Sequence, residues 1–506
     1  MQKRRLIAFT ITKPVRNFVG LTLLFVIIWT LSGCDREDFT DSPNAMVEFS
    51  VDTLMFDTVF TERGTITRYF KVYNRNDRAI RVKNARMENS DSFFRFNFDG
   101  FSQDDAGEVI IWPNDSTYVF VEATIDPDES ISASPFVIND RMLFEVNGNT
   151  QDVRIKAFGQ NANYIPANEA TGGVALLSCG GGTVVWDDPK PYVIFGVLVI
   201  DDCNLVWPAG TRVHVHGGIA SDGQIVYNDG LIFTGPNGRI LSEGTADNPV
   251  VVGGDRLEPG FAEIAGQWSG IRLGETSGPH RFEHTIIRNP IIGIRSDSAT
   301  TLDLNAVTIL NTTGPGLVGI HNNITATNCL IGNNGGHSVQ LSYGGDHNFY
   351  HTTLGNYGNQ LEALRIDNFF CYDPPHCDNI GLNPLSVNFY NSIIGGNGRD
   401  EIRIIDVTNR EPGFMNFSFD HCLVRVFDLV REQSYPEFFE ENCINCINYE
   451  LFNPLFTDLQ NNDYRLDSLS AAIGQGKPLP EVSLDIKGNP RDPDAPDVGC
   501  YEWIGN

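Results

Sequence analysis

The sequence predicts an all-β protein in which a β-sandwich is followed by a right-handed parallel β-helix. Residues 46–162 alternate apolar and polar side chains, with turn residues about every ten positions, as in a sandwich of short strands. From residue 163 onward a repeat takes over. Four asparagines (Asn289, Asn311, Asn333 and Asn356) follow one another at intervals of 22, 22 and 23 residues. A fixed period of this length is typical of a solenoid of stacked coils.

The chain begins with a predicted lipoprotein signal peptide at residues 1–33. A basic start precedes an apolar run at residues 19–30, which is short for a membrane span and suits a signal sequence. Leu31-Ser32-Gly33-Cys34 then resembles the bacterial lipobox. The resemblance implies that Cys34 is acylated and becomes the mature N-terminus. The alternative is an uncleaved anchor helix with an unrelated cysteine.

Residues 34–45 are expected to form an acidic tether. Asp35 and the acidic residues after it resemble the export signal of surface lipoproteins in some Gram-negative bacteria, whereas in other lineages Asp at this position retains the protein at the inner membrane. We expect attachment to the outer membrane through the lipid anchor, with exposure at the cell surface. The formal net charge of -28 argues against nucleic acid as a partner.

The sandwich, residues 46–162, is predicted from five clear strand patterns. They lie at residues 69–73, 79–82, 109–112, 118–121 and 142–146, and Asn147-Gly148 after the last is a strong hairpin turn. The phrase FKVYN, followed by ND and AIRV and later by PNDS, resembles immunoglobulin-like domains of the Hydin and major-sperm-protein type. That resemblance implies a spacer or adhesion module.

The β-helix, residues 163–506, is predicted to bury two apolar residues at fixed offsets in each coil. The position two before each asparagine is Ile or Leu, and the position seven before is Phe, Leu or Ala. Asparagine tolerates the left-handed turn conformation, and stacked amides can bond along a column. One short helix is expected within residues 435–442.

This second part resembles the right-handed parallel β-helix, or pectin-lyase-like, superfamily. Its tail is similar to the choice-of-anchor Q proteins through DYRL at 463–466, DIKGNPR at 485–491 and DVGCYE at 497–502, although Ala471, Gly474 and Cys500 depart from that pattern. The resemblance implies a surface or secreted β-helix with no settled activity, which ends in a C-terminal cap.

The cysteines indicate local disulfides, not a metal site. Cys371 with Cys377 and Cys443 with Cys446 are each close enough in sequence to pair. No second Cys or His pair follows Cys443 and Cys446 at zinc-site spacing. Cys329 falls on the repeat and is expected to be a stacked coil residue. We predict no cofactor, while calcium stays open because enzymes of the superfamily often use it.

Candidate ligand-binding residues lie beside an insertion at residues 358–385, which interrupts the period. They are Asp346, His347, His351, Arg365 and Tyr372. Long loops on a rigid scaffold often carry binding residues. The alternative is that His347 and His351 simply fill coil positions, since His280 and His284 share their offsets. The catalytic motifs of polygalacturonases and pectate lyases are missing.

The predicted function is therefore that of a cell-surface lipoprotein acting as a binding or scaffold module, for a glycan or a surface protein. The first alternative is a polysaccharide lyase or glycosidase with a non-standard site. The second is a purely structural stalk. An acid and a base close together in one groove would favour the enzyme, whereas a groove lined by Asn and Thr would favour binding.

Overall fold

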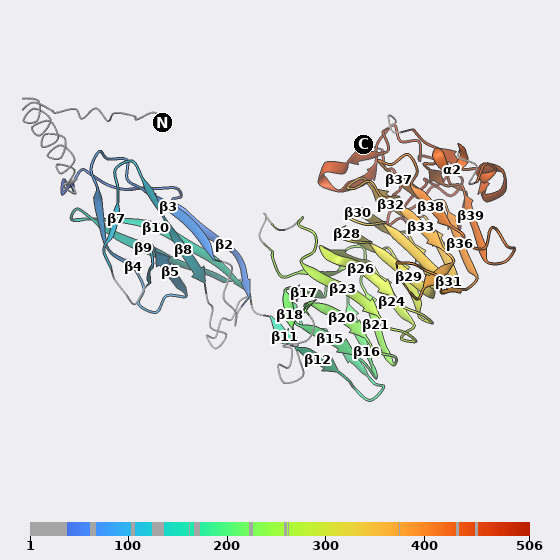
Figure 1. The fold of residues 1–506 in the computed structure, drawn as a ribbon, viewed down its shortest axis with the longest axis horizontal. Coiled ribbons are helices and arrows are strands. Elements are labelled where there is room, and N and C mark those ends of the chain that lie inside the picture. The colour runs from blue at the N-terminus through green and yellow to red at the C-terminus, as the bar shows by residue number, and fades with distance from the viewer. Residues whose placement is uncertain are drawn as a thin grey trace, which may run out of the picture. The chain divides into compact units, whose positions relative to one another are not determined.

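The computed structural model describes residues 38–60, 67–102, 107–123, 136–160, 162–165, 173–221, 226–257, 261, 263–373, 375–431, 435–450 and 454–505. The chain divides into two compact units, Met1–Gln160 and Asn161–Asn506. The regular structure of both is almost entirely β-strand, which confirms the predicted all-β fold class (Figure 1). No helix among these residues has the length and apolar character needed to cross a membrane.

The first unit is a sandwich of two five-stranded sheets. In spatial order the first sheet contains β1 (Glu48–Phe49), β3 (Arg68–Tyr73), β8 (Ser116–Ala123), β5 (Phe94–Phe98) and β6 (Phe101–Ser102). The second contains β2 (Thr53–Phe60), β10 (Asn149–Gln160), β9 (Phe136–Val146), β4 (Ile80–Met87) and β7 (Val109–Ile111). Alternate residues such as Phe70 and Val72 on β3 are buried between the sheets. Asn147 and Gly148 have positive φ, so the predicted hairpin turn joins β9 to β10.

The second unit is a parallel β-helix, as predicted, with three sheet surfaces that we call faces A, B and C. Face A is an 11-stranded sheet. Its strands are β11 (Asn163–Ile165), β14 (Tyr192–Phe195), β17 (Arg212–His216), β22 (Val250–Gly254), β25 (Thr285–Arg288), β28 (Thr308–Thr312), β30 (Leu330–Asn334), β32 (Thr353–Asn356), β37 (Ile393–Gly396), β40 (Leu423–Val424) and β42 (Ile447–Asn448).

Faces B and C belong to one 17-stranded sheet. Each face is a row of parallel strands, and two long strands connect the rows. Face B contains β12 (Val174–Leu177), β15 (Val197–Ile200), β20 (Leu231–Thr234), β23 (Trp268–Leu273), β26 (Pro290–Ser296), β33 (Leu364–Asp367) and β38 (Ile402–Ile405). Face C contains β13 (Thr183–Val185), β16 (Cys203–Pro208), β21 (Gly238–Glu243), β24 (His280–Glu283), β27 (Thr301–Asn305), β36 (Leu385–Tyr390), β39 (Met415–Asp420) and β41 (Cys443–Ile444). The long strands β29 (Leu317–Thr327) and β31 (Val339–Tyr350) run from face B into face C.

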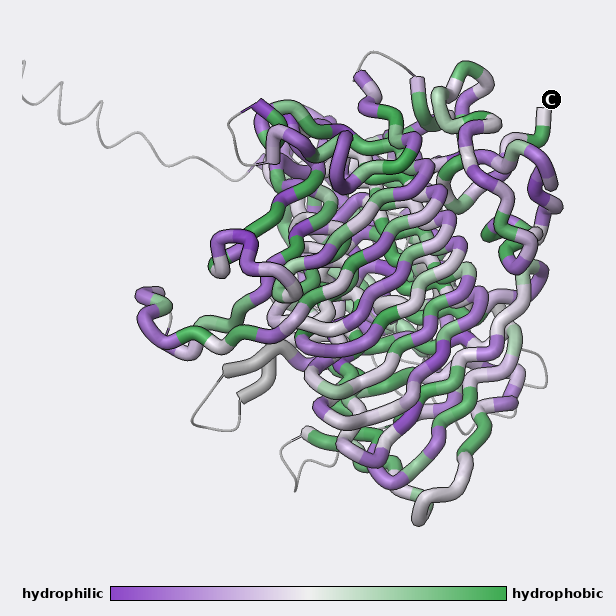
Figure 2. Tube along the Cα trace, turned by 90° about the vertical axis from the view of Figure 1, so that its right-hand side faces the viewer, coloured by the Kyte–Doolittle hydropathy of each residue, from purple (hydrophilic) through white to green (hydrophobic). Residues whose placement is uncertain are grey.

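The sequence period corresponds to one coil, which passes through faces A, B and C in turn. Residues seven before the asparagines stack in register, with Phe282 beside Leu304, Leu304 beside Ala326 and Ala326 beside Phe349. All four are fully buried, as are the residues two before each asparagine. Figure 2 shows the stacked coils with hydrophobic and hydrophilic residues interspersed along them. The predicted inward positions are therefore confirmed.

The asparagines form a ladder at the corner after face A. Asn289, Asn311 and Asn333 have positive φ. Asn311 Nδ2 donates to Asn289 Oδ1 at 3.3 Å, and Asn333 Nδ2 donates to Asn311 Oδ1 at 2.7 Å. Asn356 leaves the ladder, because its amide donates to the Leu361 carbonyl in the insertion. The stacked amides thus satisfy donors and acceptors of one another at the buried corner.

In the described part of the β-helix unit, three hairpins and a few helical turns extend from the coils. The hairpins are β18 (Ile219–Ser221) with β19 (Val226–Asn228), β34 (Phe369–Cys371) with β35 (Ile380–Leu382), and β43 (Phe456–Asp458) with β44 (Asp463–Leu466). The helical turns are α2 (Asp428–Arg431), η2 (Phe438–Asn442) and η3 (Leu459–Asn461). η2 lies within the segment where the sequence predicts a helix.

The C-terminal segment, residues 454–505, packs along the outer surface of face A and forms a second core there. Tyr464, Leu466 and Val498 of the segment are buried with Leu330 and Ile393 of face A. Gly332 and Gly355 on face A leave room for the Tyr464 ring. A Cβ atom added at Gly332 would lie 2.8 Å from that ring, and one added at Gly355 would lie 2.3 Å from it. The segment therefore lies beside the stacked coils, and its residues 481–488 form one side of a groove next to face C.

Candidate functional site

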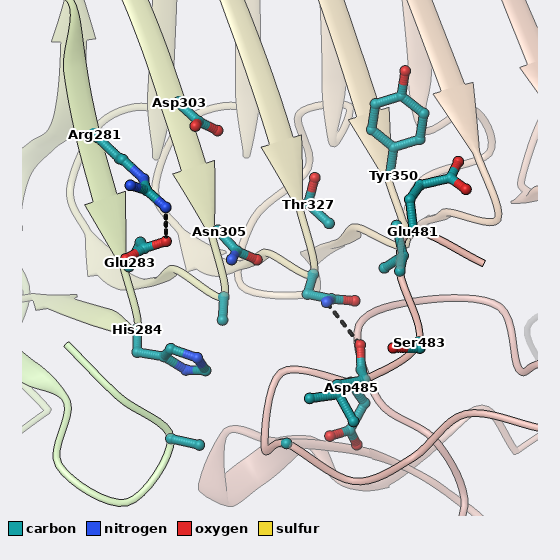
Figure 3. Close-up of a pocket in the computed structure, with 16 residues that line it drawn as sticks. Arg281, Glu283, His284, Asp303, Asn305, Thr327, Tyr350, Glu481, Ser483 and Asp485 are labelled. Atoms are coloured by element: carbon teal, nitrogen blue, oxygen red, sulfur yellow. Dashed lines mark hydrogen bonds and ion pairs between the residues drawn. The ribbon is translucent and has the colours of Figure 1, made fainter. Parts of the chain in front are cut away.

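A groove of about 600 Å³ lies on the outer surface of face C (Figure 3). Strands β24, β27, β29 and β31 form its floor, and residues 481–488 of the C-terminal segment form its wall. Strand alternation turns every second residue outward, so each coil contributes the positions six and eight before its repeat asparagine. In the groove these are Arg281, Glu283, Asp303, Asn305, Thr327 and Tyr350.

The floor carries an ion pair beside a second carboxylate. Arg281 Nη2 donates to Glu283 Oε1 on the same strand. Asp303 lies next to Arg281 in the strand register. Although Asp303 stays exposed to solvent, the groove removes part of its hydration, and this raises the pKa of its carboxyl; Arg281 opposes the shift and Glu283 adds to it. The Asp303 carboxylate can therefore accept hydrogen bonds from a ligand, and it binds a proton more readily than an ordinary aspartate does.

The wall is fixed to the β-helix by hydrogen bonds. Asn328 Nδ2 donates to the Leu484 carbonyl at 2.9 Å, and Arg491 Nη2 donates to Asn328 Oδ1 at 2.8 Å. Asp485 is buried, and its Oδ1 accepts the backbone N–H groups of Lys487 and Asn489 at 2.8 Å each. Asp485 thus serves the wall itself, whereas Glu481 is exposed at the groove.

A tyrosine closes one end of the groove. The Tyr350 and Tyr390 rings stack with centroids 5.0 Å apart and planes 8° apart. Lys477 Nζ lies 5.0 Å from the Tyr390 centroid and pairs with Asp420. Stacking on Tyr390 orients the Tyr350 ring, which offers an apolar surface to the groove.

The structure places His347 and His351 away from any surface. His347 points inward on β31, in register between Ile324 and Val387, and is 0% exposed. Burial lowers its pKa to about 4. His351 occupies a left-handed corner before face A, is fully buried and contacts Asn391 through Nε2 at 2.9 Å. Both side chains therefore fill coil positions, as the alternative interpretation holds.

The other three predicted residues lie on separate surfaces. Asp346 is exposed on the outer side of face C beyond the groove, where its backbone N–H donates to Asn323 Oδ1. Arg365 lies on the outer side of face B and pairs with Asp367 at 3.0 Å. Tyr372 is 53% exposed on the β34–β35 hairpin, and its hydroxyl lies 2.9 Å from that of Tyr343. The structure does not bring these five side chains into one pocket.

Sequence reasoning missed the groove residues, although the repeat contains a signal for the floor. Glu283, Asn305, Thr327 and Tyr350 all stand six residues before a repeat asparagine, and so share one outward column. Nothing in the local sequence marks Glu481 or its neighbours, because their place depends on how the C-terminal segment docks.

The cysteines follow the predictions in part. Cys371 and Cys377 form the predicted disulfide, which staples the hairpin, and a further disulfide joins Cys179 to Cys203. Cys443 and Cys446, for which a disulfide is predicted, are free thiols. Within the described residues, no group of three or more His, Cys, Asp or Glu side chains is arranged to hold a metal ion. Cys34 lies outside the described residues.

Comparison with known proteins adds little. No family model matches the chain, and no curated protein resembles it. A protein of unknown function from Porphyromonas gingivalis W83 is similar over 25% of this chain and 50% of its own, at 14% identity and a TM-score of 0.18. The complex of XylC with xylose is similar over 86% and 85%, at 8% identity and a TM-score of 0.30. The chain spans half the length of the first protein, and such low scores carry no argument about function.

Proposed function

We propose that this protein is a glycan-binding module, displayed by a lipid anchor, whose binding surface is the groove on face C. The observation that carries the proposal is the combination of the Tyr350 ring, stacked on Tyr390, with outward polar side chains repeated coil after coil. Binding sites for small molecules such as sugars typically combine an aromatic surface with a few convergent polar groups. Adjacent coils are about 4.8 Å apart, which is close to the length of one pyranose unit in an extended chain.

The polar column extends beyond the groove floor. Thr325, Asn348 and Asn388 occupy one outward column in register, and Asn388 Nδ2 donates to Asn348 Oδ1 at 3.1 Å. Ser418 Oγ continues the column by donating to Asn388 Oδ1 at 2.7 Å. Such neutral donors and acceptors match sugar hydroxyl groups, which also donate and accept. A surface of this kind favours binding over chemistry.

Charge narrows the class of glycan. Arg281 is already paired with Glu283, so Asp303 and Glu481 leave the groove with an excess of negative charge. A polyuronate would be repelled there, in keeping with the net charge of -28 for the whole chain. We therefore propose neutral or amino sugars as ligands. Calcium could moderate this charge, so its effect belongs in the test.

The cellular placement rests on the sequence. Lipidation at Cys34 would attach the protein to the outer membrane, with the sandwich as a spacer and the β-helix presented at the cell surface. Replacing Cys34 with Ala should release the protein from the membrane fraction. Protease added to intact cells should degrade the wild-type protein; protection would place it on an inner surface instead.

The binding test uses purified protein and a panel of neutral, amino-sugar and polyuronate oligosaccharides, with and without calcium. We expect Tyr350→Ala to weaken binding of the recognised sugar at least tenfold, while Tyr372→Ala on the hairpin does not. Asp303→Asn should change affinity for amino sugars, whereas Asp346→Asn on the same face should not. Equal loss in Tyr372→Ala, or a preference for polyuronate, would contradict this site.

One observation favours a glycosidase as a second candidate. Asp303, with its raised pKa, shares the groove floor with Glu283. A pair of carboxyl groups, one of them protonated more readily, is what glycoside hydrolysis needs. Appearance of reducing ends from a bound glycan, abolished by Asp303→Asn and retained in Asp346→Asn, would establish this activity. Binding without product would leave the module non-catalytic.

A further inference from the structure

The last coils of the β-helix bring three free thiols together: Cys422, Cys443 and Cys446, which we call the thiol cluster. Leu423 pairs with Ile447, and the Ile447 N–H donates to the Cys422 carbonyl at 2.9 Å. Cys446 therefore stacks directly on Cys422, one coil further along. Cys443 enters the same corner from face C, where it pairs with Phe419.

The stacking of Cys446 on Cys422 belongs to a column that runs through the β-helix. Its preceding members are Thr285, Val307, Cys329, Thr352 and Ser392. Hydroxyl or thiol side chains in the column donate to the carbonyl two residues earlier, as Ser392 Oγ does to Tyr390 at 2.9 Å and Cys422 Sγ to Asp420 at 3.5 Å. The two cysteines thus have equivalent backbones and point to the same side.

This geometry allows a disulfide between coils. Residues stacked in neighbouring parallel strands lie about 4.8 Å apart, and disulfides span Cα separations of about 4.4–6.8 Å. The opposite end of the β-helix contains such a bond. Cys179 and Cys203 are stacked neighbours, with the Cys179 N–H donating to the Asp202 carbonyl, and are joined with a Cα separation of 5.0 Å.

The surroundings make Cys446 the reactive member. Cys443 and Cys446 are half-buried, whereas Cys422 and Cys329 are fully buried. When Cys446 is ionised, the neighbouring Cys422 and Cys443 thiols can turn to donate to its sulfur, and this lowers the pKa of Cys446. Burial, together with the contact with Cys446, raises the pKa of Cys422, and burial raises that of the isolated Cys329 to about 12. The thiolate is the nucleophile in disulfide chemistry, so Cys446 should react first.

We propose that the thiol cluster is a thiol–disulfide exchange site, at which Cys446 forms a disulfide with Cys422 that closes the last coil of the β-helix. The oxidant is an external disulfide. The Cys446 thiolate attacks one of its sulfurs, forms a mixed disulfide and releases a thiolate. Cys422 then loses its proton and attacks Cys446 Sγ, which releases the second thiolate. Two protein sulfurs lose two electrons in total, and the external disulfide gains them to become two thiols.

The Cys422–Cys446 disulfide would protect the end of the hydrophobic core at the last described coil of the β-helix. Beyond β41 and β42 the described structure has no further coil, and the open end of a solenoid needs a cap. η2 contributes Phe438, which is fully buried and packs against Phe419 with ring centroids 5.5 Å apart. A Cys422–Cys446 bond would tie β42 to β40 beside this cover.

Trypsin can distinguish the possible disulfides, because Cys422 lies in the peptide 411–425 while Cys443 and Cys446 share the peptide 432–465. The full chain is incubated with oxidised glutathione, blocked with iodoacetamide and mapped without reduction by mass spectrometry. We expect the two peptides to be cross-linked in the wild type and in Cys443→Ser, but not in Cys446→Ser. Alkylation of Cys446 in the reduced protein should be at least about 100-fold faster than that of Cys329.

The control is Cys329→Ser, which changes the same column outside the cluster and should leave the cross-link intact. On oxidation, amide hydrogen exchange in residues 443–448 should slow at least tenfold. A disulfide found only within peptide 432–465, or three thiols that remain alkylatable after oxidation, would overturn the proposal. Both results are independent of glycan binding, so they can be distinguished from failure of the proposed function.

Discussion

His347 gives a quantitative prediction about the acid sensitivity of the β-helix. It lies in the core between Ile324 and Val387, and neither ring nitrogen makes a hydrogen bond of normal geometry in the described part of the chain. We predict that His347→Leu removes most of one histidine's contribution to acid destabilisation. Leucine suits the site because it matches its apolar neighbours in the column and is similar in volume to histidine.

The magnitude follows from proton linkage. Burial lowers the pKa of His347 from 6.5 to about 4, so below pH 6.5 the unfolded chain binds a proton that the folded protein does not. Its contribution to stability is fully present above pH 6.5, falls as the pH drops, and is lost once the pH passes about 4. At about 1.36 kcal/mol per pH unit, the cost at pH 4.5 relative to pH 7.5 is about 2.5 kcal/mol.

The assay is guanidinium-induced unfolding of wild type and variant at pH 7.5, 6.5, 5.5 and 4.5, followed by two spectroscopic probes. At pH 7.5 we expect His347→Leu to be as stable as the wild type or up to about 2 kcal/mol more stable, because two unpaired buried nitrogens are removed. Its advantage should grow by about 2.5 kcal/mol at pH 4.5. The exposed His376→Leu is the matched control. A stability difference that does not change with pH would refute the reasoning.

Three further predictions concern the β-helix scaffold. Asn311→Ala should lower the free energy of unfolding by about 1–3 kcal/mol. Asn311→Gly should lower it by less, because glycine keeps the left-handed turn and loses only the hydrogen bonds of the side-chain amide. Thermal unfolding measures both. Gly270→Ala should prevent accumulation of folded protein, because the new Cβ would lie 1.8 Å from the Ile292 carbonyl oxygen. Gly413→Ala should cost only about 1–2 kcal/mol, because that glycine has positive φ but open space around it. Soluble yield measures the first effect and melting temperature the second. Cys179→Ser opens a disulfide with a sequence separation of 24 and should cost about 3.5 kcal/mol in denaturant unfolding. Reduction of the wild type should cost at least as much, because it also opens Cys371–Cys377. Wild type that is unaffected by the reductant would contradict this last expectation.

The sequence by itself determined the class of fold and the contents of each coil. Each coil repeats the same backbone, so the spacing of Asn289, Asn311 and Asn333 was enough to predict the inward residues and the amide ladder. The hairpin at Asn147 and the Cys371–Cys377 bond were predictable for a different reason, because each depends only on residues close together in the chain.

Only the tertiary structure decided where the candidate site lies. The wall of the groove docks through Asn328 and Leu484, which are 156 residues apart, and no local pattern specifies that contact. Histidine near an insertion suggested chemistry, but alternation along β31 turned His347 into the core and Tyr350 outward. Cys443 and Cys446 looked like a self-contained pair until stacking placed Cys422 beside them. A periodic sequence encodes the coil, whereas contacts between coils and the segment packed on them depend on the packing of distant residues.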